Sequence, residues 1–268
     1  MKQLIITGDD FGLCSSVNEA IEQAHCQGIL TTASLMMGES GTQNAIDRAH
    51  RLSTLKIGLH ITVVDGTPVL PPQMIPDLIG ENGRFRSQLF GSGVRFYFIP
   101  KVQKQLEDEI RAQFKAFAAT GLSLDHVNSH HHMHLHPTVL QIILKVGQEF
   151  GVRAIRLPYE PIFTVSNLFL GLWVHFMTHQ LRKNNILNNQ FIFGLKNTGK
   201  IDTAQILQII NNLPEGVSEL YTHPDLNISG NSSSGFLELC TLTSLEVKES
   251  LRSQQIKIIT FSDLSTNN

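Results

Sequence analysis

The stretch LDHVNSHHHMHLHP, residues 124–137, predicts a strand, a run of histidines and the start of a helix in direct succession. Five of the chain's twelve histidines fall within positions 130–136. We interpret residues 124–129 as a short strand. Pro137 suits the first turn of a helix, where its missing N–H costs nothing, and Gly151 suits the end of that helix. The stretch therefore indicates one β-α unit with imidazoles at the carboxyl end of its strand.

The same alternation of short strands and longer amphipathic segments extends along the whole chain. Strands are predicted at 3–7, 31–37, 55–61, 124–129, 152–157, 218–223 and 256–262, and helices at 15–27, 41–52, 102–120, 137–149, 203–212 and 243–254. Such a succession, with no linker, favours a single α/β domain over residues 1–268, either a barrel or a doubly wound sheet. We expect a distorted (β/α) TIM-like barrel with about seven strands.

Chemically active side chains fall at the carboxyl ends of these strands, where (β/α) barrels place their active sites. In chain order they are Asp9, Asp10, His60, the histidine run, Arg156, His223 and Asp263. Residues 67–85 and 229–235 are rich in Pro, Gly or Ser and predict loops.

Composition excludes some classes of function. The chain has 21 Lys and Arg against 23 Asp and Glu, without blocks of like charge, so we expect no nucleic-acid partner. Three cysteines stand far apart, and two aspartates precede any apolar run of signal length. We therefore expect a cytoplasmic protein.

The histidine run favours a metal site. A neutral imidazole is the commonest metal ligand, and a catalytic site typically has three protein ligands and one open position. In an extended segment, alternate histidines from His130 to His136 would share one face, whereas in a helix His130 and His134 would lie one turn apart. The alternative is a set of core or capping histidines, but burying so many rings without partners would be costly.

The aspartate pair in GDDFG, residues 8–12, complements the histidines. Adjacent carboxylates repel unless a cation or a proton separates their roles, so one can bind metal while the other accepts a proton. The alternative is a cap for the following helix, although Ser15 or Ser16 could cap it equally well. Together with GLH at 58–60, the pair favours a metal site.

Four motifs give the chain a resemblance to a known family. TGDDFGL (7–13), IGLHI (57–61), DHVNSHHHMHLHP (125–137) and THPD (222–225) resemble the YdjC-like (ChbG-type) carbohydrate deacetylases, in order and spacing along nearly the whole chain. The resemblance implies a barrel similar to that of NodB-type deacetylases, and hydrolysis of the linear amide of an N-acetylated amino sugar. Members usually carry Gly after His-Pro, where this chain has Asp225.

The same resemblance implies roles for individual residues. It makes Asp10, His60 and His130 the ligands of one divalent ion, and Asp9 the general base. Mg is usually assigned to the family, whereas mixed nitrogen and carboxylate ligands also suit Zn.

Three further roles follow from the chemistry of amide hydrolysis. His223 would protonate the leaving nitrogen. Arg156 would hold Asp9 ionised through a charge-assisted pair, unless it forms only a surface salt bridge. His132 and His134 would orient metal ligands or bind the sugar.

Two segments bear on the substrate. RLPYEP (156–161) and ELYTHPD (219–225) resemble the hopanoid-biosynthesis-associated HpnK branch, which implies an N-acetylglucosaminyl hopanoid. Residues 161–181 contain no Asp, Glu, Lys or Arg and repeat apolar residues at helical spacing. They predict either a buried helix or an apolar lid for a glycolipid, with peripheral membrane contact but no transmembrane segment. We also expect a homo-oligomer, a dimer.

Two functions other than deacetylation are compatible with these residues. A metal-dependent phosphoesterase on a similar barrel could use clustered His and Asp, although one common class opens with His-x-His where this chain has DDFG. The other rival is a non-catalytic sugar-binding module. Retention of the complete Asp-Asp, His and His set argues against that module.

Overall fold

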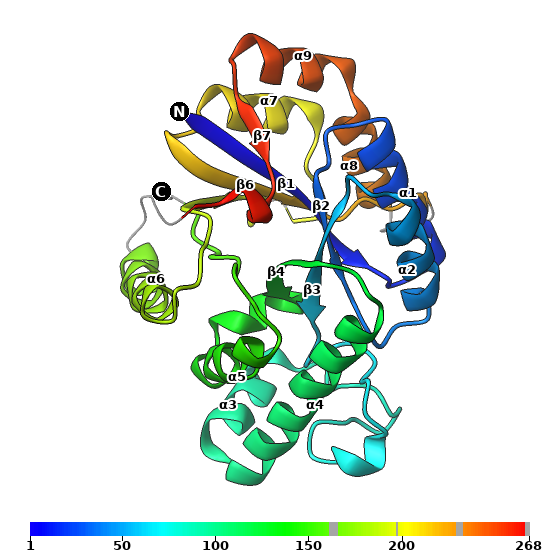
Figure 1. The fold of residues 1–268 in the computed structure, drawn as a ribbon, viewed down its shortest axis with the longest axis vertical. Helices are drawn as coiled ribbons and strands as arrows, with labels where there is room; N and C mark the ends of the chain where they lie inside the picture. Colours follow the sequence, from blue (N-terminus) through cyan, green and yellow to red (C-terminus); the bar gives the residue numbers. More distant parts are fainter. Residues whose placement is uncertain (161–165, 197, 229–232, 266–268) are drawn as a thin grey trace.

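A computed structural model describes residues 1–160, 166–196, 198–228 and 233–265. Its parallel sheet has the order β4-β3-β2-β1-β6-β5, and β7 also pairs with β1 (Figure 1). The strands are β1 (Lys2–Phe11), β2 (Thr32–Leu35), β3 (Lys56–Ile61), β4 (Leu124–Ser129), β5 (Phe191–Phe193), β6 (Gly216–Thr222) and β7 (Lys257–Ile259). The predicted α/β class is confirmed.

The sheet curls, and an irregular segment crosses the gap between its edge strands β4 and β5. Ile155 forms an isolated bridge with Val127 of β4, and Ala154 forms one with Leu187. The prediction of a regular strand at 152–157 is therefore wrong, because its backbone bonds go to separate segments and no ladder continues. The outcome is the expected distorted barrel, with its weakest pairing at this gap.

Helices surround the sheet (Figure 1). They are α1 (Ser15–Cys26), α2 (Thr42–Arg51), α3 (Leu89–Phe98), α4 (Pro100–Ala119), α5 (Pro137–Glu149), α6 (Ser166–Lys183), α7 (Thr203–Asn211), α8 (Ser233–Thr243) and α9 (Leu245–Ser253), with short 3-10 turns η1 (Pro72–Met74), η2 (His130–Leu135) and η4 (Phe261–Asp263). Pro137 begins α5 as predicted. α3, α8 and β5 were not predicted. Of the loop expected at 229–235, residues 229–232 lie outside the described residues and residues 233–235 belong to α8.

The interior of the barrel is polar, unlike the layer between sheet and helices. Thr7, Thr32, Ser34, Asn128 and Glu219 are all fully buried on the strands. The apolar side chains of the strands and helices form the main core outside this set. Buried polar side chains require hydrogen-bond partners, so the strands carry a fixed polar network toward the barrel mouth.

The predicted apolar segment 161–181 corresponds largely to α6. Residues 161–165 lie outside the described residues. Within α6, the half-buried Trp173 donates its indole N–H to Leu135 O at 2.8 Å, and Phe176 is 42% exposed. Among the described residues, the model contains no helix long and apolar enough to cross a membrane.

Candidate metal centre

A bulge near the end of β1 brings two adjacent carboxylates to one end of the barrel. The register with β2 shifts between Gly8 and Phe11, and Asp10 has a φ of 61°. Successive strand residues normally point to opposite faces, and a bulge re-aims them. Aspartate is among the residues that tolerate this left-handed conformation. Neither aspartate caps α1, whose N-cap is Cys14.

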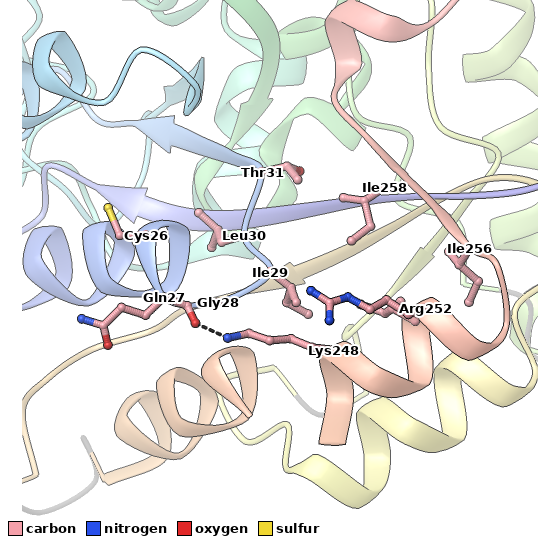
Figure 2. A pocket seen from close by; sticks show the side chains of 11 residues that line it. Cys26, Gln27, Gly28, Ile29, Leu30, Thr31, Lys248, Arg252, Ile256 and Ile258 are labelled. Atoms are coloured by element: carbon pink, nitrogen blue, oxygen red, sulfur yellow. Dashed lines mark hydrogen bonds between the residues drawn. The ribbon is translucent and has the colours of Figure 1, made fainter. Parts of the chain in front are cut away.

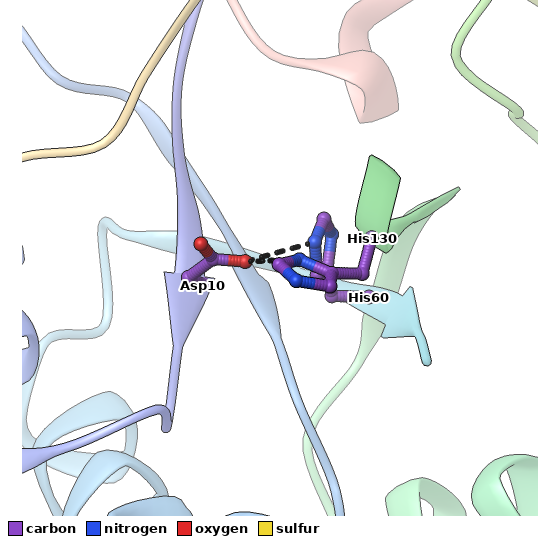
Figure 3. Close-up of side chains that lie close together, drawn as sticks. All are labelled: Asp10, His60 and His130. Atoms are coloured by element: carbon purple, nitrogen blue, oxygen red, sulfur yellow. Dashed lines mark hydrogen bonds and ion pairs between the residues drawn. The ribbon is translucent and has the colours of Figure 1, made fainter. Parts of the chain in front are cut away.

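Asp10 meets two histidines from different strands (Figure 3). Its Oδ1 lies 2.9 Å from His130 Nδ1 and 3.1 Å from His60 Nε2. His60 is the penultimate residue of β3, and His130 follows β4 directly. Ligand atoms that each lie about 2.0–2.2 Å from one ion are separated by such distances. The three residues implied as ligands thus lie together, with donor atoms within 4.8 Å of one another.

The Asp10 carboxylate and the His60 ring nitrogen beside it fit a cation. Among the described residues, His60 Nε2 is buried without a hydrogen-bond partner, although it faces Asp10. Burial alone would raise the pKa of Asp10, but its contacts with His130 and His60 outweigh burial and hold that pKa well below its usual value. An ionised carboxylate beside an unpaired ring nitrogen is a donor set that a divalent ion would satisfy.

Asp9 belongs to a separate set of contacts. Arg156 donates to both of its oxygens, from Nη1 to Oδ2 at 2.5 Å and from Nη2 to Oδ1 at 2.9 Å. Ser34 Oγ and Asn128 Nδ2 also donate to Oδ1, at 3.1 and 3.0 Å. Burial would raise the pKa of Asp9, but Arg156 and then His60 hold it well below its usual value. Asp9 is therefore a fixed, ionised acceptor.

Arg156 joins Asp9 to a second buried carboxylate. Its Nη2 lies 2.7 Å from Glu219 Oε1, and Thr7 Oγ1 donates to the same oxygen at 2.7 Å. The ring of Tyr221 lies 5.1 Å from the guanidinium carbon. Arg156 is fully buried, so the alternative of a surface salt bridge is wrong. Sequence analysis missed the role of Glu219, because its partner lies 63 residues away.

His223 and both aspartates line one cavity of about 250 Å³, together with Asp225. Within the described part of the chain, His223 Nδ1 is buried without a hydrogen-bond partner, and the backbone N–H of His223 donates to Glu238 Oε2 at 2.5 Å. The carboxylates and imidazole predicted to act in catalysis therefore share one cavity. Sequence analysis did not single out Glu238, because the helix that carries it, α8, was not predicted.

The histidine run forms a kinked 3-10 turn, so both backbone geometries considered for it were wrong. His131 and His132 have φ values of 52°. The His132 ring lies 5.2 Å from that of Tyr221. Burial, and after it the charge of Arg156, lowers the pKa of His132 to about 3. His134 is fully buried and its Nδ1 lies 2.7 Å from Ser129 Oγ. This burial favours a structural role for His134 within the turn. For His132 and His134, contact with the sugar stays a prediction.

Two other groups lie apart from this centre. Asp65 and His131 could form a second ligand group with His130, on the exposed side. Asp263 was expected at the site, but it lies in η4, where its carboxylate accepts a hydrogen bond from the backbone N–H of Thr260. The preceding strand, β7, pairs with the first half of β1, away from the end that carries Asp9 and Asp10. A cavity of about 430 Å³ lined by Lys248 and Arg252 lies near the amino end of β2 (Figure 2).

Comparison with known proteins places the chain in a family. Residues 3–253 match the family described as YdjC-like protein. The chain belongs to the YdjC-like family. A relative from Brevibacillus brevis named carbohydrate deacetylase is 31% identical, covering 98% of this chain and 99% of the relative. Another of that name, from Vibrio vulnificus strain CMCP6, is 29% identical over 98% of this chain and 96% of its own length.

A solved structure supports the fold of this YdjC-like chain. A proposed cellobiose-phosphate cleavage protein from Enterococcus faecalis has a TM-score of 0.82 and 26% identity, covering 99% of both chains. The agreement over 99% of both chains confirms the curled parallel α/β fold.

Proposed function

We propose that this protein is a metal-dependent carbohydrate deacetylase, which hydrolyses the N-acetyl amide of an amino sugar. The observation that carries the proposal is that the two adjacent carboxylates contact different partners. Asp10 faces His60 and His130, whereas Asp9 is bound by Arg156. One carboxylate can therefore bind an ion while the other handles a proton. The names of the relatives from Brevibacillus and Vibrio support the same chemistry.

Charge balance supports a divalent ion. Arg156 pairs with Asp9 and Glu219, whereas Asp10 faces His60 and His130. With these histidines neutral, the three carboxylates and one guanidinium leave two uncompensated negative charges. Buried unpaired charge is costly, and one divalent cation at Asp10 would neutralise the set. When bound, such an ion would polarise the acetyl carbonyl and acidify a water molecule. Mg and Zn are both candidates.

The surrounding residues fit the remaining steps. Asp9 accepts a proton from the attacking water, and Arg156 fixes the orientation of the Asp9 carboxylate. His223, on the same cavity, donates a proton to the departing nitrogen. Asp9 takes one proton from the water that forms the new C–O bond, and His223 gives another to the nitrogen as the C–N bond breaks, so the products are acetate and a free amine.

A direct assay tests this function. Purified protein is incubated with N-acetylglucosamine and N,N′-diacetylchitobiose, and acetate is measured with EDTA and after adding Zn²⁺ or Mg²⁺. Phosphate release from 4-nitrophenyl phosphate is followed in parallel. We expect acetate release that chelation abolishes and metal restores. Faster phosphate release would instead support a phosphoesterase, and sugar binding without either product would support a binding module.

We also propose that the sugar is carried on an apolar aglycone such as a hopanoid. α3 exposes Phe90 and Phe98 (86% and 70%), and its Tyr97 ring lies 6.3 Å from that of His136. Trp173 of α6 contacts the adjacent Leu135. Both helices thus border the turn that ends the histidine run. Apolar side chains beside a sugar site would favour a lipid-linked substrate.

Glycosides that differ only in the aglycone test this preference. We expect kcat/KM to be higher for the octyl than for the methyl glycoside of N-acetylglucosamine, and higher again for an N-acetylglucosaminyl hopanoid. Phe90→Ser and Phe98→Ser should remove the difference, whereas Leu245→Ser, an exposed control on α9, should not. Equal rates for all glycosides would rule out the lipid-linked substrate. A dimer and a cytoplasmic location stay predictions, the first testable by light scattering.

A further inference from the structure

We propose that Asn128 is a positioning residue that couples the base Asp9 to the metal ligand His60. This inference rests on the proposed metal-dependent function. Asn128 lies on β4, is fully buried, and uses both ends of its side-chain amide. Its Oδ1 lies 2.7 Å from His60 Nδ1, and its Nδ2 lies 3.0 Å from Asp9 Oδ1 and 2.8 Å from Ser34 Oγ.

The neighbours of Asn128 determine which way its amide points. Asp9 is ionised in its contact with Arg156, so its oxygens can only accept hydrogen bonds. The NH2 group of Asn128 must therefore face Asp9, which leaves the carbonyl oxygen facing His60. A carbonyl oxygen can only accept, so His60 Nδ1 must carry a proton.

This tautomer prepares His60 to bind a cation. With the proton on Nδ1, the lone pair is on Nε2, the buried nitrogen that has no hydrogen-bond partner and lies 3.1 Å from Asp10 Oδ1. Histidines that bind metals commonly donate their other N–H to a fixed acceptor, which sets the tautomer and the ring orientation. Asn128 supplies that acceptor here.

The same amide also restrains Asp9. Oδ1 of Asp9 accepts from Asn128, Ser34 and Arg156, while the only donor to Oδ2 among the described residues is Arg156 Nη1. The carboxylate is thus held at both oxygens, with Asn128 and Ser34 adding to Arg156 at Oδ1. Asn128 consequently acts on both the metal affinity and the base, whereas the hydrogen bonds of Ser34 go to Asp9, His126 and the NH2 end of Asn128.

Three variants separate these effects. The dissociation constant for Zn²⁺ is measured by competition with a chromophoric chelator. Asn128→Ala removes the acceptor and should weaken Zn²⁺ binding by about 10- to 100-fold. Asn128→Asp keeps an acceptor for His60 but cannot donate to Asp9, so it should restore the affinity while lowering kcat. Ser34→Ala, the matched control, should keep the wild-type affinity.

Nitrogen-15 NMR of the metal-free protein gives a second readout. The wild type should show His60 protonated at Nδ1, and Asn128→Ala should show a mixture of tautomers. The inference is overturned if Asn128→Ala binds Zn²⁺ within twofold of the wild type, or if Asn128→Asp binds as weakly as Asn128→Ala. If the wild type binds Zn²⁺ but releases no acetate from any acetylated sugar, the proposed function fails while these affinity results stand.

Discussion

Arg156 holds both oxygens of Asp9, with Nη1 2.5 Å from Oδ2 and Nη2 2.9 Å from Oδ1. This two-point contact fixes the plane of the carboxylate as well as its position, because the guanidinium is itself planar. Glu219 fixes the guanidinium in turn from its other side. Asp9, the proposed base, is therefore oriented by Arg156 and Glu219.

Removing this arginine should destabilise the protein strongly. Arg156→Met leaves Asp9 and Glu219 buried without their cation, and breaking a buried ion pair costs about 3–5 kcal/mol. We expect a loss of that size in the free energy of unfolding, measured with guanidinium chloride at neutral pH. Arg156→Lys, which keeps the charge but not the two-point contact, should lose less stability. Equal stability of Arg156→Met and wild type would contradict the ion-pair interpretation.

The contribution of Asp9 to stability should depend on pH. Its pKa in the folded protein lies well below the ordinary value of 3.8. A depressed pKa stabilises the fold above the unfolded-state pKa, and that stability is lost as the pH falls toward the folded pKa. Asp9→Asn should thus be less stable than wild type by about 1.5–3 kcal/mol at neutral pH. The difference should persist to about pH 5 and shrink below about pH 4. A difference that grows on acidification would have the wrong sign.

Metal content should separate Asp9 from the proposed ligand His130. His130→Ala should lose both the ion and turnover, whereas Asp9→Asn should keep the ion and lose most turnover. The measurement is metal stoichiometry after reconstitution, alongside acetate release. His131→Ala is the matched control, since His131 contacts the exposed Asp65 instead of Asp10. Loss of metal in that control would move the site to the second ligand group.

The role of His223 can be tested through the leaving group. A general acid contributes typically 10²- to 10⁴-fold to the rate, and only where the leaving group needs a proton. His223→Ala should therefore lower kcat for an acetylated amine by about that factor, with normal metal content. Hydrolysis of 4-nitrophenyl acetate, whose leaving group departs as a stable anion, should fall much less. Equal losses on both substrates would indicate a structural role for His223.

Local signals in the sequence were sufficient for much of the fold. Pro137 predicted the start of α5, because proline is favoured in the first turn of a helix. Short elements gave weaker signals: β5 has three residues, too few for a periodic pattern. The helix predicted at 243–254 corresponds to α9, and α8, which ends just before it, was not predicted. These elements are defined by their packing against neighbours.

The sequence by itself determined which residue types stand at the carboxyl ends of the strands. Asp9, Asp10, His60 and His223 were found in this way, since a parallel barrel brings those ends together whatever the details of packing. Motif and strand order were enough, because both are local or topological properties of the chain.

Only the tertiary structure decided how these residues divide their work. The bulge at Asp10 aims neighbouring carboxylates at different partners, and Asn128 bonds to Asp9 across 119 residues of sequence. Arg156 meets Asp9 across 147 residues and Glu219 across 63. Hydrogen bonds between such distant residues depend on ångström-scale placement and burial, which no periodicity in the sequence encodes.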